Sequence, residues 1–247
     1  MISGFDMKLK RRELLQAASA VLAVGSLSFP VGAQTSAATK LKIGIVGSGR
    51  VGGTLGGAWV KAGHEVMFSS LDIEHDRKLA ASLGPNARAG TTREAAAFGS
   101  VLLISVPYKA LPGIGKDLAE LIKGKILIDT SNPNVARDGE MAAAARDKGA
   151  GLASSEYLPG ARIVRAFNAI GYARMTEAAA KRGQVGMPIA GDDQNAISVA
   201  SALIRDVGYE PVLVGTLAVM GRYLIPGTPL AGERSPEEIR KIMATLK

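Results

Sequence analysis

The sequence predicts an α/β fold with a mostly parallel sheet, and three observations carry this prediction. The chain has 247 residues, enough for one sizeable core with a small annex. From residue 41 onward, short apolar runs alternate with longer segments of helical periodicity. The first apolar run leads into a glycine-rich turn and then into a helical pattern. Together these features favour a doubly wound parallel sheet.

The composition argues against several kinds of site. The chain has no cysteine, which excludes disulfides, thiol nucleophiles and thiolate-bound metals. With only two histidines, His64 and His75, a histidine-rich metal centre is not expected, and we predict no metal site. The net charge is +8, but the basic residues are scattered and aromatic residues make up 4% of the chain. We therefore expect no nucleic-acid partner.

The first 33 residues have the pattern of an export signal. A basic stretch at 8–12 precedes a moderately apolar stretch at 14–29, and small residues allow cleavage near Ala33. RRELL at 11–15 resembles the twin-arginine signal. We expect a signal peptide over 1–33, a linker over 34–40 and a periplasmic or otherwise exported protein whose partner is the twin-arginine export machinery. An uncleaved signal would instead anchor the chain to a membrane, and this alternative stays open.

The first βα unit contains a phosphate-binding pattern. LKIGIV at 41–46 reads as a buried strand, 51–62 as a helix and 65–68 as a second strand. Between the first two elements, the glycines stand at GxGxxG spacing, as in a dinucleotide-binding Rossmann fold. We predict a nucleotide-binding Rossmann domain over 41–168, with a tight turn that binds nothing as the alternative. The predicted cradle consists of Gly47, Ser48, Gly49, Arg50, Val51 and Gly52.

The end of the second strand favours NADP over NAD. NAD enzymes usually place a carboxylate there for the ribose diol. Here Ser69 and Ser70 offer hydroxyl donors suited to a 2′-phosphate, and Arg77 and Lys78 follow within reach. Asp72 argues for NAD instead, because a shift of one register step would place its carboxylate on the ribose diol. The two basic residues could also belong to a solvated helix face.

Three further apolar runs, 100–105, 123–129 and 161–167, predict parallel strands. The carboxyl ends of parallel strands meet at one edge of the sheet, so the residues that follow them should line one mouth with the glycine loop. Any of these residues could instead serve only as a turn former. The expected mouth residues are Val106, Pro107, Tyr108, Ser131, Asn132, Pro133 and Asn168.

The remaining chain predicts a smaller C-terminal α/β part. Residues 185–190 and 211–214 read as strands, and a helix between them ends at Val207. SPEE at 235–238 combines a Ser cap, a Pro and a Glu three residues on, which marks the start of a last helix. We expect residues 169–247 to form a substrate-side domain.

The stretch IGIVGSGRVGGTLGGAWVKAGHEV resembles the opening of the coenzyme F420-dependent NADP oxidoreductases, also called NADPH-dependent F420 reductases. The likeness continues in order through ISVPYKAL, GKILIDTSNP, LPGARIVRAFN, PIAGDD and DVGYEPVLVG, and it covers residues 40 to about 227. The resemblance implies NADP on the glycine loop of a Rossmann domain. A flat deazaflavin would stack on the nicotinamide, and hydride would pass directly between the rings. This chain would be an exported variant of the family.

The resemblance also implies roles for individual residues. Ser70 would contact the 2′-phosphate, although Leu71 stands where the family often has an arginine. Family members often form dimers, which makes a homodimer possible here. Four residues would contact the pyrophosphate: Ser48, Gly49, Arg50 and Val51. Three would lie beside the nicotinamide and the acceptor: Pro107, Asn132 and Asn168.

The residues favour a ring as hydride acceptor. Direct transfer between stacked rings needs positioning more than acid–base groups, whereas a carbonyl substrate needs a proton donor. The chain has no Tyr-x-x-x-Lys pair and no histidine on the expected substrate side. We expect an NADP(H)-dependent oxidoreductase whose small-molecule redox partner is coenzyme F420 or a flavin, with a quinone-like ring or a metal chelate also open. The alternatives are an imine or carbonyl reductase related to pyrroline-5-carboxylate reductase and a non-catalytic dinucleotide sensor.

Overall fold

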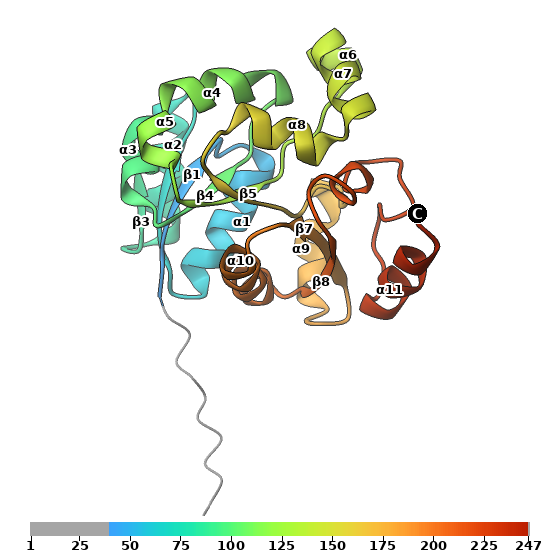
Figure 1. The fold of residues 1–247 in the computed structure, drawn as a ribbon. Coiled ribbons are helices and arrows are strands. Elements are labelled where there is room, and N and C mark those ends of the chain that lie inside the picture. Colours follow the sequence, from blue (N-terminus) through green and yellow to red (C-terminus); the bar gives the residue numbers. More distant parts are fainter. Residues whose placement is uncertain (1–39, 247) are drawn as a thin grey trace, which may run out of the picture. The chain divides into compact units, whose positions relative to one another are not determined.

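One eight-stranded sheet runs through residues 40–246, the part of the chain that this computed structural model describes (Figure 1). The predicted signal peptide, residues 1–33, lies outside the described residues, as does the linker apart from Lys40. The strand order is β3-β2-β1-β4-β5-β6-β7-β8, and every neighbouring pair is parallel except β6 with β7. The strands are β1 Lys42–Val46, β2 Glu65–Ser69, β3 Ala87–Ala89, β4 Val101–Ile104, β5 Ile126–Asp129, β6 Arg162–Arg165, β7 Gly186–Gly191 and β8 Glu210–Gly215.

The strand order confirms the predicted doubly wound α/β fold. From β1 the chain adds β2 and β3 on one side, then returns to add β4, β5 and β6 on the other. The glycine loop follows β1 at this reversal, where ligands bind in open parallel sheets. The helices are α1 Arg50–Lys61, α2 Ile73–Leu83, α3 Thr92–Phe98, η1 Tyr108–Ala110, α4 Leu111–Asp117, α5 Ala119–Ile122, α6 Val135–Asp138, α7 Glu140–Lys148, α8 Ala150–Tyr157, α9 Tyr172–Ala180, α10 Gln194–Val207, η2 Gly221–Tyr223 and α11 Pro236–Thr245.

Apolar side chains cover both faces of the sheet. In β4, Val101 and Leu103 belong to one buried cluster, while Leu102 and Ile104 belong to another on the opposite face. This alternation explains why the strand sequences are continuous apolar runs. Each fully buried large side chain contributes about 1.5–3 kcal/mol relative to its exposed state.

The helix caps follow the sequence closely. Both Ser/Thr-x-x-Glu patterns form capping boxes, one from Thr91 to Glu94 and one from Ser235 to Glu238. The predicted strand 161–167 ends earlier, at Arg165. Phe167 explains the early end, because its φ of 62° lies in the left-handed region that a strand cannot contain.

The sheet continues across residue 168, the expected boundary of the nucleotide-binding domain. Strands β7 and β8 extend it, and α10 packs on α1 from the first half. The indole N–H of Trp59 on α1 donates to the Leu203 carbonyl of α10 at 2.8 Å. The substrate-side role of residues 169–247 stays a prediction. Among the described helices, none has both the length and the apolar character needed to span a bilayer.

Candidate nucleotide and acceptor site

The three loop glycines have different structural roles. A Cβ at Gly47, where φ is +98°, would lie 2.2 Å from the Ser105 carbonyl oxygen. A Cβ at Gly52 would lie 2.1 Å from the Gly47 carbonyl oxygen. These two glycines are therefore required by the turn and by its packing. A Cβ at Gly49 would meet no atom within 4 Å, so this part of the backbone faces open space that a ligand can approach.

The N-terminus of α1 faces the same space. Gly49 caps the helix without a side chain, and the first helical hydrogen bond runs from the Gly53 N–H to the Gly49 carbonyl at 2.7 Å. The amides of the residues between them have no acceptor within the helix. Together with the helix dipole, these amides form a site for an anion such as a pyrophosphate.

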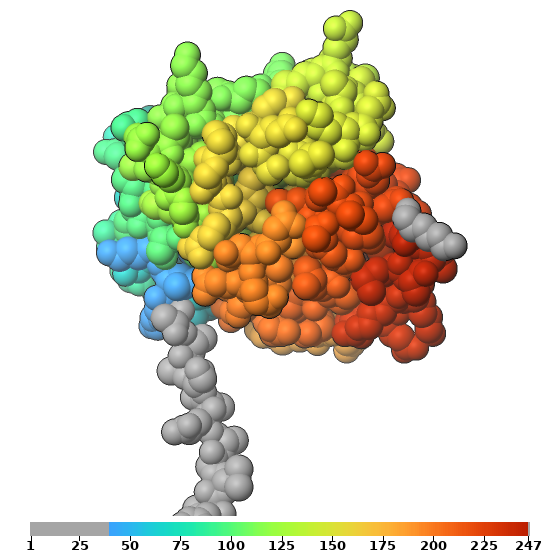
Figure 2. Space-filling view, in the orientation of Figure 1, coloured from blue at the N-terminus to red at the C-terminus, as the bar shows by residue number. Residues whose placement is uncertain are grey.

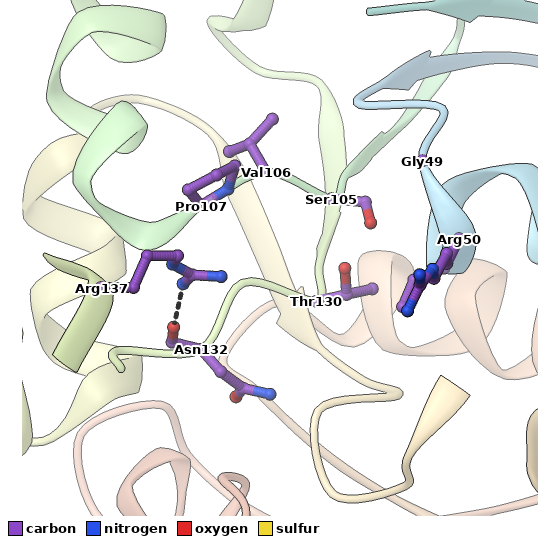
Figure 3. A pocket seen from close by; sticks show the side chains of 9 residues that line it. Gly49, Arg50, Ser105, Val106, Pro107, Thr130, Asn132 and Arg137 are labelled. Carbon is purple, nitrogen blue, oxygen red and sulfur yellow. Dashed lines mark hydrogen bonds between the residues drawn. The ribbon is translucent and has the colours of Figure 1, made fainter. Parts of the chain in front are cut away.

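A cavity of about 350 Å³ lies beside this helix end. Figure 3 shows Arg50 on one side of it and Pro107 and Arg137 on the other. The cavity thus lies at the carboxyl ends of β1, β4 and β5, as the strand pattern predicts. Its lining residues are Gly49, Arg50, Val51, Ser105, Val106, Pro107, Thr130, Asn132 and Arg137.

The lining includes three residues that the sequence analysis did not single out as site residues. Ser105 and Thr130 lie at the ends of strands and could have been inferred from the same reasoning as their neighbours. Arg137 lies on the short helix α6, which carries no recognisable signal in the sequence. Its guanidinium is held by Asp138 through bonds of 2.9 and 2.7 Å, and this partner raises the pKa of Arg137.

Tyr108 does not line the cavity, which corrects the prediction that it faces the acceptor. Its side chain is fully buried, and its hydroxyl donates to the Ala150 carbonyl at 3.0 Å and lies 3.2 Å from Ser154 Oγ. Burial raises the pKa of Tyr108 to about 12. The residue enters the turn η1, which directs its ring into the core against α8 rather than toward the mouth.

Asn168 lies next to Asn132 but is not among the residues that line the cavity. Its side chain is 1% exposed and donates to the Ser131 carbonyl at 3.3 Å. The Asn132 side chain donates in turn to the Asn168 carbonyl at 2.9 Å. The loop after β5 is thus bonded to Asn168, which follows β6. Contact of either asparagine with a nicotinamide or an acceptor stays a prediction.

The two serines at the end of β2 are engaged within the protein. Ser69 is buried, and its hydroxyl donates to the Ile45 carbonyl at 2.6 Å. Ser70 donates to the buried carboxylate of Asp76 at 2.9 Å, and Ser48 donates to the same carboxylate. A hydroxyl has one proton, so Ser48 and Ser70 can donate to phosphate only by releasing Asp76. The prediction that Ser69 contacts the 2′-phosphate is wrong, because its side chain faces the core.

The basic residues expected near a 2′-phosphate lie on the outer face of α2. The Arg77 side chain is 65% exposed and pairs with Glu74, and Lys78 is exposed. Asp72, the contrary observation for NADP, caps α2 by accepting the His75 amide at 3.0 Å. Contact of Arg77 or Lys78 with a phosphate stays a prediction.

A buried ion pair supports the floor of the site. Arg165 on β6 and Asp129 on β5 have fully buried side chains, and their charged groups lie 2.6 Å apart. Arg165 also donates to the carbonyls of Ser131 at 3.0 Å and Leu224 at 3.2 Å. It therefore joins the loop after β5 to the segment after β8. In the sequence, Arg165 lies within an apolar strand pattern, so its role could not be predicted.

Sequence comparisons identify related proteins. Residues 42–133 match the family model described as NADP oxidoreductase coenzyme F420-dependent. Metalloreductase STEAP3 of Rattus norvegicus is 29% identical over 177 residues, which are 72% of this chain and 34% of that protein. The chain therefore spans about a third of the length of this curated relative.

Solved structures share the fold at low sequence identity. A hypothetical protein from Sinorhizobium meliloti, SMa0349, aligns with a TM-score of 0.67 and 24% identity, covering 79% of this chain and 95% of that one. A putative F420-dependent NADP-reductase from Arthrobacter sp. FB24 aligns with a TM-score of 0.59 and 20% identity, covering 74% and 90%. An imine reductase from Myxococcus stipitatus in complex with NAD+ aligns with a TM-score of 0.54 and 18% identity, covering 75% and 58%.

These structural likenesses establish a Rossmann-like α/β fold. The glycine loop and eight of the nine residues that line the cavity lie within the range that matches the family model. The family match over residues 42–133 indicates similarity to NAD(P)-binding oxidoreductases.

Proposed function

We propose that this protein is an NADP(H)-dependent oxidoreductase that transfers a hydride between nicotinamide and a flat ring acceptor, either a deazaflavin or a flavin. The observation that carries the proposal is the open backbone at Gly49, next to the unpaired amides of α1 and the cavity of about 350 Å³. An anion at the helix end would extend directly into that cavity.

The described residues fit a dinucleotide. The amides of Arg50, Val51 and Gly52 would hold the pyrophosphate, and the Arg50 guanidinium adds a positive charge. Val106 and Pro107 offer an apolar wall for a flat ring. The bound nicotinamide supplies the hydride chemistry, while the protein's residues bind and orient the two rings.

The end of β2 supports NADP as the cofactor. Asp72 is engaged in a helix cap, and Asp76 is buried beneath two serine hydroxyls. Neither carboxylate is therefore placed as the usual partner of a ribose diol. Lys78 on the next helical turn supplies a positive charge for a 2′-phosphate.

The cavity lining supports a ring acceptor over a carbonyl. No histidine, lysine, tyrosine or carboxylate is found among the residues that line it. The only hydroxyls come from Ser105 and Thr130, which are weak proton donors. A ring that takes a hydride directly needs to be positioned but needs no strong proton donor, so it suits this lining. The similarity to a metalloreductase makes a ferric chelate the second candidate acceptor. Two ferric ions would then take one electron each from NADPH, with the release of one proton.

Two measurements test the proposal. NADPH and NADH are titrated into the purified protein by calorimetry, and bound NADPH is then mixed in a stopped-flow instrument with a deazaflavin, FMN or ferric citrate. We expect NADPH to bind more tightly than NADH and to be oxidised rapidly by a ring. Tight binding without oxidation by any acceptor would favour an imine or carbonyl substrate, or a sensor.

The Gly49→Asp substitution tests the position of the cofactor. A carboxylate there would face the pyrophosphate, and we expect NADPH binding to weaken by about 2 kcal/mol or more. Gly113→Asp is the matched control, because Gly113 on α4 also faces open space. Normal NADPH binding by Gly49→Asp would remove the glycine loop from the site.

A further inference from the structure

We propose that the acceptor carries an anionic group, a phosphate or a carboxylate, and that Arg146 binds this group in a second cavity adjoining the first. The proposal rests on the proposed function, since it concerns the molecule that meets the nicotinamide. It adds a specificity residue and the cavity that would hold the anionic group.

The second cavity shares a wall with the first. Its volume is about 360 Å³, and Asn132 and Arg137 line both cavities. An acceptor ring beside Pro107 could therefore extend past Asn132 into the second space. The full lining consists of Asn132, Pro133, Asn134, Arg137, Arg146 and Pro226.

Two distant parts of the chain enclose this cavity. One side is α7 with the loop after β5, and the other is the segment after β8. Figure 2 shows the yellow-green segment that carries α7 beside the orange-red segment that follows β8. A bond of 3.3 Å from the Arg222 guanidinium to the Lys148 carbonyl fixes the two sides together.

The combined lining is strongly basic. It contains Arg50, Arg137 and Arg146, and it contains no aspartate or glutamate. Arg50 lies beside the helix end that would hold the cofactor's pyrophosphate. Arg137 is paired with Asp138 and also donates to the Asn132 carbonyl at 2.9 Å. These two arginines therefore already have partners or an assigned ligand.

Arg146 is the remaining charge. Within residues 40–246 its one hydrogen bond is a contact of 3.4 Å from Nη1 to the Pro133 carbonyl, and none of the ion pairs in that range includes it. The residue lies in the last turn of α7, so its backbone is fixed. A guanidinium with most of its N–H groups free can bind a phosphate or carboxylate through two parallel hydrogen bonds.

FMN and riboflavin provide matched probes, because they share one ring system and differ by one phosphate. Their binding to the full chain saturated with NADP+ is measured by calorimetry, and their reduction by NADPH is measured as kcat/KM. We expect FMN to bind about tenfold more tightly than riboflavin, as a charge-assisted pair would require. In Arg146→Gln the two affinities should become similar, with that of riboflavin unchanged.

Two further variants separate a specific contact from general charge. Arg146→Lys keeps the charge but loses the fork of donors, so it should retain part of the preference for FMN. Arg240→Gln removes an exposed arginine from α11 and should leave the preference intact. Competition with FMN binding by inorganic phosphate would indicate a phosphate-bearing acceptor, and competition by citrate would indicate a carboxylate-bearing one.

Equal binding of FMN and riboflavin to the wild-type protein would overturn the proposal, as would an unchanged ratio in Arg146→Gln. The proposed function fails differently, through the absence of NADPH binding or of hydride transfer to every ring. Because the affinity ratio is an equilibrium measurement, it tests the Arg146 subsite whether or not a ring is reduced.

Discussion

Arg50 connects the glycine loop to α9. Its guanidinium lies 4.8 Å from the centre of the Tyr172 ring, and it also donates to the Tyr172 hydroxyl. Arg50 at the same time lines the cavity where the cofactor is proposed to bind. Tyr172 therefore holds a flexible cation close to the position of the pyrophosphate, which reduces the entropy lost on binding.

We expect Tyr172→Ala to raise the Kd of NADPH roughly tenfold, because Arg50 loses the stacking contact and the hydrogen bond, about 1 kcal/mol each, that hold it in place, and only part of this free energy bears on binding. Tyr172→Phe keeps the stacked ring and should have a smaller effect. Calorimetric titration of both variants measures the difference. Tighter binding by Tyr172→Ala would show instead that the tyrosine competes with the cofactor for Arg50.

Lys78 bears on the choice between the two nicotinamide cofactors. We expect Lys78→Glu to weaken NADPH binding roughly tenfold, since it replaces an exposed attraction of about 1 kcal/mol with a repulsion. NADH, which lacks the 2′-phosphate, should bind as before. Lys116→Glu on α4 makes the same charge change on another exposed residue and controls for net charge. Equal losses for NADPH and NADH would mean that Lys78 does not contact the 2′-phosphate.

Single residues show what the sequence could not predict. The sequence indicates Ser70 as a hydrogen-bond donor to phosphate, but its hydroxyl donates to Asp76 instead. In the sequence, Asp76 belongs to a charged stretch that is typical of a solvated helix. Tyr108 follows a strand end, but the direction of its ring depends on a short turn. Both outcomes depend on tertiary partners that local patterns do not encode.

At the scale of elements, the loop after β5 lines the site and is held in place by hydrogen bonds from neighbouring elements. Arg165 and Asn168 hold its backbone from β6, and Arg137 holds it from α6. Both Arg165 and Asp129 are fully buried, so water cannot solvate either charge and each depends on the other for stabilisation. The loop therefore keeps its geometry only while this ion pair is intact.

We expect Arg165→Met to lower the free energy of unfolding by about 3–5 kcal/mol, because it leaves the buried Asp129 carboxylate without a positive charge beside it. The double variant Arg165→Met with Asp129→Leu should recover much of that loss. Urea denaturation of the single and double variants measures both effects. A double variant as unstable as the single one would show that the other hydrogen bonds of Arg165 dominate.

Seven of the eight described strands were predictable, most of them because parallel strands buried on both faces require uninterrupted apolar runs. Strand β3 was missed because its three residues, ARA, are not a buried apolar run. The glycine loop and the two capping boxes were predictable because their chemistry is local. Helices α6, α7 and α8 were not predicted. They are short, rich in alanine and separated by Gly139 and Gly149, so they show no strong apolar stripe. Arg137 and Arg146, which lie on them, were missed for the same reason.

At the scale of the whole molecule, the two halves of the described chain share one sheet and one packed interface between α1 and α10. Because the sheet and this interface both cross residue 168, we expect the two halves to fold as one cooperative unit. This is consistent with the proposal that residues 1–33 direct export by a route that carries folded proteins.

The export proposal depends on the arginine pair. We expect the double substitution of Arg11→Lys and Arg12→Lys to trap the precursor in the cytoplasm, because the export machinery reads this pair as an address. Cell fractionation followed by immunoblotting measures the distribution. Unchanged export would indicate ordinary secretion, and the variant Lys8→Arg with Lys10→Arg controls for other changes in the basic region.

The buried indole of Trp59 gives this protein its own optical probe. The chain has a single tryptophan, and its ring lies in the core between α1 and α10. Its emission should therefore shift to longer wavelength only when the contact between the two halves is lost. Reduced nicotinamide absorbs light in the range where tryptophan emits, and α1 begins at the proposed pyrophosphate site. Binding of NADPH should quench this one fluorophore by energy transfer, so unfolding and cofactor binding can be followed in the unlabelled protein.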